Sequence, residues 1–245
     1  QVNNETGAVQ PIGEIGGLLA RRKAEGKTVP WFHVDGVQGI GKVPVSLKKM
    51  PVDSFSGSGH KIGAPKGTGI LVLRREILPL AAGGGQEGGI RPGTENLPGI
   101  AATAFAVERS VRELESRRRH AEKLIDLTRT LLGRNEAAER IRFLRESGDF
   151  SPFILSFSVP PLPSETIVRI MDDAGFSVSA GSACASNKKH GKERVLIGSG
   201  FDRKLASSAV RISTGPTTTE EEIRGFCDAF GKFVLPLAGQ LKGNK

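Results

Sequence analysis

The chain has 245 residues, of which 38% are hydrophobic and 25% charged, and its formal net charge is +9. This composition suits a globular protein of one large or two small domains, and no stretch approaches the ~20 apolar residues that a membrane-spanning helix needs. The first residues lack the features of a signal peptide, and the two cysteines are too few for a disulfide framework, so we expect a cytoplasmic protein. The basic residues are scattered and have no aromatic stripe beside them, so direct nucleic-acid binding is not expected either.

The first half of the chain predicts an α/β architecture. A helix begins at Pro11, and three short apolar segments with the character of buried strands follow it, at residues 31–34, 52–55 and 69–73. Because strands separated by helices are typical of parallel sheets, we expect a mainly parallel sheet. Residues 81–99 form a glycine-rich segment whose length indicates a functional loop.

The second half has an α/β pattern of its own. A long helical stretch covers residues 97–132 and is expected to bend or break near Ser116. The elements expected after it are a strand at 153–159, a helix at 164–174, a strand at 209–213 and a helix at 219–234. We therefore expect a larger domain at residues 1–115 and a smaller C-terminal domain at residues 116–245.

One glycine-rich stretch imitates a nucleotide-binding loop. Residues 36–42 match the P-loop pattern up to its last position, which must be Ser or Thr to bind magnesium, but Val43 stands there. Pro44 also disfavours the helix that should follow. We interpret the match as accidental and expect no metal site.

The segment Ser56-Gly-Ser-Gly-His60-Lys61 indicates a covalent cofactor site. A lysine in a glycine-serine loop after an apolar strand can be desolvated enough to form a Schiff base. The hydroxyl of Ser58 and the backbone N–H groups beside it are suited to a phosphate. The alternative is a surface lysine in a turn, which is the commoner case.

Asp35 follows a buried strand at the end where open α/β sheets place their ligands. A carboxylate there needs a cationic partner, and a protonated pyridine nitrogen would supply one. Gln38 could reach the same ligand. The alternative is that Asp35 caps a turn. His33 is interpreted as a core histidine.

The two cysteines differ in their surroundings. Cys184 lies among small residues and is followed by Lys188, Lys189 and His190, whose charge would favour a reactive thiolate. Cys227 lies in an apolar helical segment and is predicted to be buried and inert.

Arg211 lies between apolar residues on a predicted buried strand. A buried guanidinium needs an anionic partner, and its fork of N–H groups suits the carboxylate of a substrate.

Together these segments resemble the cysteine desulfurases of the class V aminotransferase superfamily, which have the fold type I architecture of pyridoxal-phosphate enzymes. The resemblance extends in family order over nearly the whole chain. The matching stretches are residues 2–7, 33–38, 56–67, 88–94, 179–186 and 210–213. It implies part of a large cofactor-binding domain, mainly of parallel sheet, and a smaller C-terminal α/β domain that carries the reactive cysteine.

The resemblance also implies a role for each matching residue. Lys61 would hold pyridoxal 5'-phosphate and move protons at the substrate α-carbon, and Cys184 would take sulfur from L-cysteine as a persulfide, leaving L-alanine. The implied cofactor contacts are Asp35 at the pyridine nitrogen, Gln38 and Asn4 at the phenolic oxygen, and Ser58, His60 and Thr94 at the phosphate. Thr94 would reach across from the other subunit of a homodimer. Arg211, with Asn4 nearby, would bind the substrate carboxylate.

The resemblance also leads to expectations about the activity of this chain alone, the sulfur acceptor and the alternative functions. The family carries about 150 further residues before the Asn-Asn-Glu segment, so we expect these 245 residues alone to be inactive and prone to association. The persulfide would serve a sulfur-acceptor or iron–sulfur scaffold protein, or tRNA thiolation. The alternatives are a selenocysteine lyase and a non-catalytic interaction module that binds a partner without the cofactor.

Overall fold

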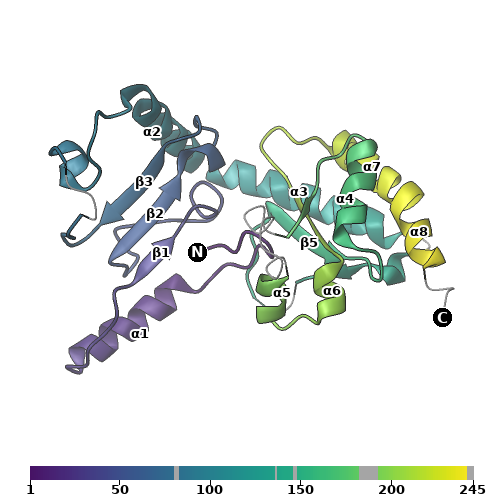
Figure 1. Cartoon of the computed structure of the whole chain (residues 1–245), viewed down its shortest axis with the longest axis horizontal. Helices are drawn as coiled ribbons and strands as arrows, with labels where there is room; N and C mark the ends of the chain where they lie inside the picture. Colours follow the sequence, from purple (N-terminus) through teal and green to yellow (C-terminus); the bar gives the residue numbers. More distant parts are fainter. Residues whose placement is uncertain (80–82, 136, 146–147, 182–192, 242–245) are drawn as a thin grey trace. The chain divides into compact units, whose positions relative to one another are not determined.

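The computed structural model describes residues 1–79, 83–135, 137–145, 148–181 and 193–241. The chain divides into two compact units, and Figure 1 labels their α-helices and some of their strands. The first unit comprises Gln1–Val2 and Gln10–Glu115, and the second comprises Asn3–Val9 and Ser116–Lys245. In the described part of the chain, no helix has the length and apolar character needed to cross a membrane.

The first unit contains a sheet in the order β1-β2-β3. Its elements are α1 (Ile12–Ala24), β1 (His33–Asp35), β2 (Ser54–Ser58), the 3-10 helix η1 (Gly59–Lys61), β3 (Gly69–Leu73), the 3-10 helix η2 (Gln86–Gly89) and α2 (Leu97–Arg112). The side chains of Val34 and Phe55 anchor its small core, together with Ile12, Ile40 and Val52.

The expectation of a mainly parallel sheet is wrong for the strands described. β1 pairs with β2 in parallel, but β2 pairs with β3 antiparallel, from Ser54 opposite Leu73 to Ser58 opposite Gly69. The physical reason is the connection: residues 59–68 contain only η1 and turns, so the chain reverses without the helical crossover that a parallel neighbour requires.

The second unit contains a four-stranded sheet in the order β4-β5-β7-β6, and all its pairings are antiparallel. Its strands are β4 (Arg142–Phe143), β5 (Ile154–Ser158), β6 (Ser179–Ala180) and β7 (Ala209–Ser213). Its helices are α3 (Leu114–Gly133), η3 (Ala138–Arg140), α4 (Ser164–Asp173), α5 (Arg194–Gly198), α6 (Arg203–Ser207), α7 (Glu220–Ala229), the π-helix η5 (Phe230–Val234) and α8 (Leu235–Gln240).

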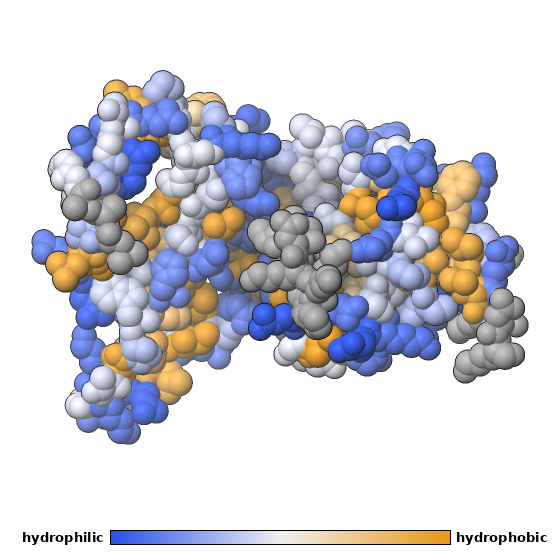
Figure 2. Space-filling view, in the orientation of Figure 1, coloured by the Kyte–Doolittle hydropathy of each residue, from blue (hydrophilic) through white to orange (hydrophobic). Residues whose placement is uncertain are grey.

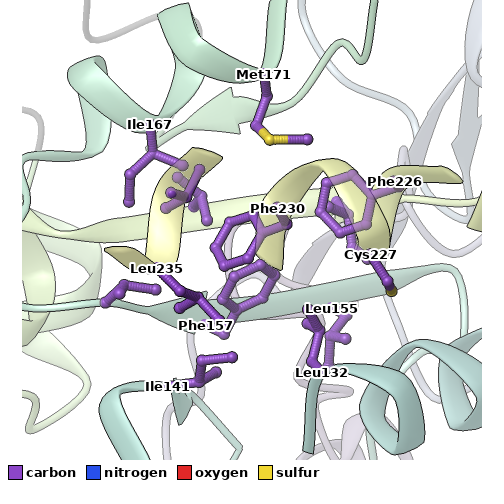
Figure 3. Packing of buried hydrophobic residues seen from close by; sticks show 14 of the residues in the cluster. Leu132, Ile141, Leu155, Phe157, Ile167, Met171, Phe226, Cys227, Phe230 and Leu235 are labelled. Atoms are coloured by element: carbon purple, nitrogen blue, oxygen red, sulfur yellow. The ribbon is translucent and has the colours of Figure 1, made fainter. Parts of the chain in front are cut away.

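The larger hydrophobic core lies in the second unit, where β5, α7 and η5 meet (Figure 3). The rings of Phe157 and Phe230 are both fully buried and pack edge to face with their centroids 5.4 Å apart. This core of buried apolar side chains holds β5 and β7 in place.

The start of α7 is fixed by a capping box, in which Thr219 and Glu222 each accept a backbone N–H of the other.

Residues 3–9 were expected in the first domain, but their contacts lie in the second unit. Ala8 forms a β-bridge with Phe150, the N–H of Val9 donates to the carbonyl of Asp149, and the N–H of Ser151 donates to the carbonyl of Gly7. Gly7 has φ +79°, a conformation that favours glycine. The segment is thus held by backbone hydrogen bonds that hydrophobic periodicity does not reveal.

Most predicted elements are confirmed within a few residues. The strand predicted at 209–213 is β7 with the same bounds, and the long helix breaks at Glu113, close to the position expected. The interpretation of His33 as a core histidine is wrong, because its side chain is exposed and contacts the hydroxyls of Ser54 and Ser56. Side chains of β1 alternate between faces, and only the Val34 face is covered in the described structure.

Hydrophobic side chains also reach the surface of the first unit (Figure 2). Leu97, Phe105 and Val111 of α2 are exposed by 69%, 63% and 59%. Exposed apolar residues on one helix are a common feature of surfaces that associate.

We predict that Phe230→Ala lowers the free energy of unfolding of the second unit by about 3–5 kcal/mol, because it removes a fully buried ring and leaves a cavity. Phe233→Ala, in the same π-helix but with a side chain 46% exposed, is the matched control and should change it by less than about 1 kcal/mol. Urea denaturation followed by circular dichroism measures both. Equal effects of the two substitutions would contradict the assignment of the core.

Candidate cofactor and substrate site

The parallel pairing of β1 and β2 creates the first half of the candidate site. His33 lies opposite Ser54 and Asp35 opposite Ser56, so the carboxyl ends of the two strands open at the same edge of the sheet. Asp35 ends β1, while β2 ends at Ser58 and continues directly into η1. This edge therefore collects the polar residues that follow both strands.

Asp35 and Gln38 lie on the turns that follow β1. Asp35 Oδ1 accepts the backbone N–H of Val37 at 2.9 Å, so Asp35 does cap a turn. Within the described part of the chain, no hydrogen bond to its second carboxylate oxygen is present. Gln38 Oε1 accepts a hydrogen bond from Lys42 Nζ at 2.7 Å. Because lysine can only donate, this contact fixes the amide so that its NH₂ group is turned away from Lys42 and can donate to another acceptor.

Ser58, His60 and Lys61 lie together where β2 passes into η1. Ser58 Oγ and His60 Nδ1 are 2.8 Å apart, and the side chains of His60 and Lys61 are exposed. Gly59 makes this turn possible: a Cβ there would lie 2.7 Å from Thr68 Oγ1 and 2.8 Å from Thr103 Oγ1. The glycine between the serine and the histidine is therefore a packing requirement.

Gly36 has a similar role after β1. A Cβ on Gly36 would lie 1.9 Å from the buried ring of Phe55, so only glycine lets the chain turn over β2 immediately after Asp35. The backbone N–H of Gly36 also donates to the carbonyl of Ser56 at 2.8 Å. These contacts fix the position of Asp35 relative to β2.

Thr94 lies in the loop between η2 and α2 and is exposed. Arg91 Nη1 donates to the carbonyls of Gly93 at 3.2 Å and Thr94 at 3.1 Å, so its guanidinium holds the turn on which Thr94 lies. Among the hydrogen bonds of the described residues, none joins Thr94 to Lys61, and the expected contact of Thr94 across a homodimer stays a prediction.

These residues fit pyridoxal phosphate by their chemistry. A carboxylate suits the protonated ring nitrogen, an oriented amide NH₂ suits the phenolic oxygen, and a hydroxyl beside an imidazole suits the phosphate. Lys61 supplies the amine. Among the described residues, no group of three or more His, Cys, Asp or Glu side chains is placed to hold a metal ion.

The second unit contains Arg211 and Asn4. Arg211 Nη1 donates to the carbonyl of Asn4 at 2.5 Å, and Nη2 donates to Ser179 Oγ at 3.1 Å, so the structure brings together two residues that lie far apart in the sequence. Burial lowers the pKa of the Arg211 guanidinium, and the charge of Glu5 opposes that change. The cation expected on β7 is thus present and half-buried.

Of the two cysteines, only Cys227 lies among the described residues. Cys184, with residues 182–192 around it, lies outside the described residues. Cys227 is buried in α7, as predicted, and burial together with the charge of Asp228 raises the pKa of its thiol to about 12. A thiol with that pKa is almost fully protonated near neutral pH and is a poor nucleophile.

Three residues near the site were missed from the sequence. Lys42 orients Gln38, and Asn3 Oδ1 accepts the N–H groups of Glu5 and Thr6, which shapes the turn before Gly7. Glu5 is only 4% exposed, although it lies in a polar segment. The i,i+4 spacing of Gln38 and Lys42 was a usable signal, whereas nothing in the sequence indicated that Glu5 is buried.

The family model for class-V aminotransferases matches residues 1–226. The chain is 37% identical over 229 residues to the cysteine desulfurase IscS of Rickettsia typhi, covering 91% of this chain and 52% of that protein. It is 36% identical over 241 residues to the mitochondrial cysteine desulfurase of Drosophila melanogaster, covering 95% of this chain and 49% of that protein. The chain spans about half the length of the curated relatives it matches.

Solved structures agree with this similarity. The X-ray structure of a NifS-like protein from Rickettsia africae superposes with a TM-score of 0.81 at 29% identity, over 94% of this chain and 59% of that one. The chain therefore belongs to the class-V aminotransferase family, a family of pyridoxal-phosphate enzymes. Within it, the similarity is to the cysteine desulfurases, over part of their length.

Proposed function

We propose that this chain carries the cofactor-binding and sulfur-accepting residues of a cysteine desulfurase, which converts L-cysteine to L-alanine and leaves a persulfide on Cys184. The observation that carries the proposal is the edge of the sheet where β1 and β2 both end. A carboxylate, an oriented amide, a hydroxyl–imidazole pair and a lysine all lie on that edge, at Asp35, Gln38, Ser58, His60 and Lys61.

Each of these residues has a separate task. Asp35 keeps the ring nitrogen protonated, and Gln38 donates its amide N–H to the phenolic oxygen. Ser58 and His60 bind the phosphate. Lys61 would hold the cofactor covalently and would carry protons to and from the substrate α-carbon. When bound, pyridoxal phosphate supplies an electron sink for the bond-breaking steps at the substrate.

The second unit supplies the substrate contacts in this proposal. Arg211, held by Asn4 and Ser179, binds the carboxylate of cysteine through its remaining N–H groups. The thiolate of Cys184 would attack the substrate sulfur. The new S–S bond would form as the C–S bond breaks, and the electrons of the C–S bond would go to the substrate β-carbon, which then takes up a proton and becomes the methyl group of L-alanine. A solved relative that superposes with a TM-score of 0.66 at 29% identity, SspA, is in complex with cysteine, which supports this choice of substrate.

The similarity to cysteine desulfurases also supports a proposal for the oligomeric state, the cellular location and the sulfur acceptor. We propose a cytoplasmic homodimer in which Thr94 contacts the phosphate bound by the other subunit. The persulfide sulfur then passes to an acceptor or scaffold protein for iron–sulfur cluster assembly, or toward tRNA thiolation. A selenocysteine lyase would share the cofactor residues, and comparing turnover of cysteine with turnover of selenocysteine separates the two activities.

We predict that Lys61 is the residue joined to the cofactor. Borohydride reduction of the intact protein loaded with pyridoxal phosphate should make the attachment permanent, so that mass spectrometry finds the pyridoxyl group on the peptide with Lys61. Lys61→Ala should abolish both the labelled peptide and turnover, because no other amine occupies this turn. Lys66→Ala removes an exposed lysine just beyond η1 and is the control, expected to keep both. Label on Lys66 in the unsubstituted protein would refute the assignment.

We predict that Cys184→Ser keeps the cofactor and still binds cysteine but forms no persulfide, because a hydroxyl is a far poorer nucleophile toward sulfur than a thiolate. Incubation with cysteine that carries radioactive sulfur, followed by separation without reductant, measures the protein-bound label. Cys227→Ser is the matched control and should retain full labelling, since that thiol is buried. Label that follows Cys227 instead would show that the wrong thiol was chosen.

A further inference from the structure

Glu5 is an acid buried in the second unit with no role in the reaction described above. Its side chain is only 4% exposed, and Oε2 is fully buried without a hydrogen-bond partner among the described residues. The backbone around it is held on both sides: Asn3 Oδ1 accepts the N–H of Glu5 at 2.9 Å, and Ser156 Oγ donates to the carbonyl of Glu5. The backbone of Glu5 is therefore fixed within the second unit, and its carboxylate lies in the interior.

A buried carboxylate without a hydrogen-bond partner lowers the free energy of unfolding. An unsatisfied buried polar group costs about 1–3 kcal/mol, and a charged group costs more. Burial accordingly raises the pKa of Glu5, and the charge of Arg211 opposes that change. A carboxyl group whose pKa is higher in the folded state contributes stability only at low pH, and that contribution is lost as the pH rises through the folded pKa. Above its folded pKa, the ionised Glu5 thus weakens the fold.

The backbone of Glu5 lies beside Arg211, because Arg211 Nη1 donates to the carbonyl of the preceding Asn4. Ser156, which donates to the carbonyl of Glu5, is the cross-strand partner of Arg211. Arg211 Nη1 and Nη2 each donate one hydrogen bond, while its Nε is buried without a partner in the described part of the chain. A guanidinium has five N–H donors in a rigid fork. The two contacts use one N–H group on each terminal nitrogen, and the further N–H groups on these nitrogens stay available for an anion.

We propose that Glu5 is a positioning residue: it supplies the buried counter-charge that keeps the Arg211 guanidinium on β7 oriented to bind the carboxylate of the amino-acid substrate. This inference rests on the substrate-binding role proposed for Arg211. Glu5 acts through Arg211 and does not touch the substrate. This role explains why an acid is buried at this position although its Oε2 has no hydrogen-bond partner among the described residues.

The test compares Glu5→Gln with the unsubstituted intact protein at pH 7. Isothermal titration with propionate, a carboxylate without an amino group, measures anion binding at Arg211, and thermal denaturation measures stability. We expect Kd for propionate and KM for cysteine to rise roughly tenfold with kcat unchanged, the size expected for one charge-assisted interaction. The unfolding midpoint should stay equal or rise. Glu5→Asp keeps the charge and should restore part of the affinity.

Two further variants make the outcomes decisive. Glu76→Gln removes an exposed acid from the first unit and should change neither affinity nor midpoint. If Arg211→Gln weakens propionate binding but Glu5→Gln does not, the inference about Glu5 is overturned and the role of Arg211 stands. If Arg211→Gln leaves binding unchanged, the substrate role of Arg211 fails, and the inference fails with it. A Glu5→Gln protein that does not fold also contradicts the inference, because removing the charge should not weaken the fold.

Discussion

The parallel pairing of β1 with β2 is the constraint on which the candidate site depends. Because both strands run in the same direction, the turn after Asp35 and the turn that carries Lys61 leave the sheet at one edge. The close approach of the two turns depends on small residues: a side chain at Gly36 would strike the ring of Phe55, and one at Gly59 would strike Thr68 and Thr103. The course of the backbone therefore brings the two turns to one edge, and the polar side chains on these turns provide the groups that can bind a ligand.

The second unit differs from the first in that it buries charged side chains. Arg211 and Glu5 both lose hydration, and each opposes the shift in the other's pKa. The aromatic core around Phe157 and Phe230 supplies the rigidity that lets β5 and β7 hold such residues. Buried charges rarely stabilise a fold as well as apolar residues would, and both residues belong to the substrate-binding arrangement proposed above.

Particular residues show how far the sequence alone predicts this protein. The short strands were predictable because apolar runs such as residues 69–73 and 209–213 are bounded by polar or glycine-rich segments. The antiparallel pairing of β3 was not, since it depends on the conformation of a short connection. Lys61 and Asp35 stood out by residue type and position. The burial of Glu5 could not be predicted, because Ser156 and Arg211, which act on it, lie far away along the chain.

In the proposed function, the shared edge of β1 and β2 binds pyridoxal phosphate, with Asp35 at the ring nitrogen. The most direct measurement is the dissociation constant of pyridoxal phosphate for the intact protein and for its Asp35→Ala variant, determined by equilibrium dialysis. We expect the variant to bind roughly tenfold to a hundredfold more weakly, the size of one lost charge-assisted hydrogen bond. Equal affinity in the two proteins would contradict the claim and would mean that the cofactor, if it binds, binds somewhere else.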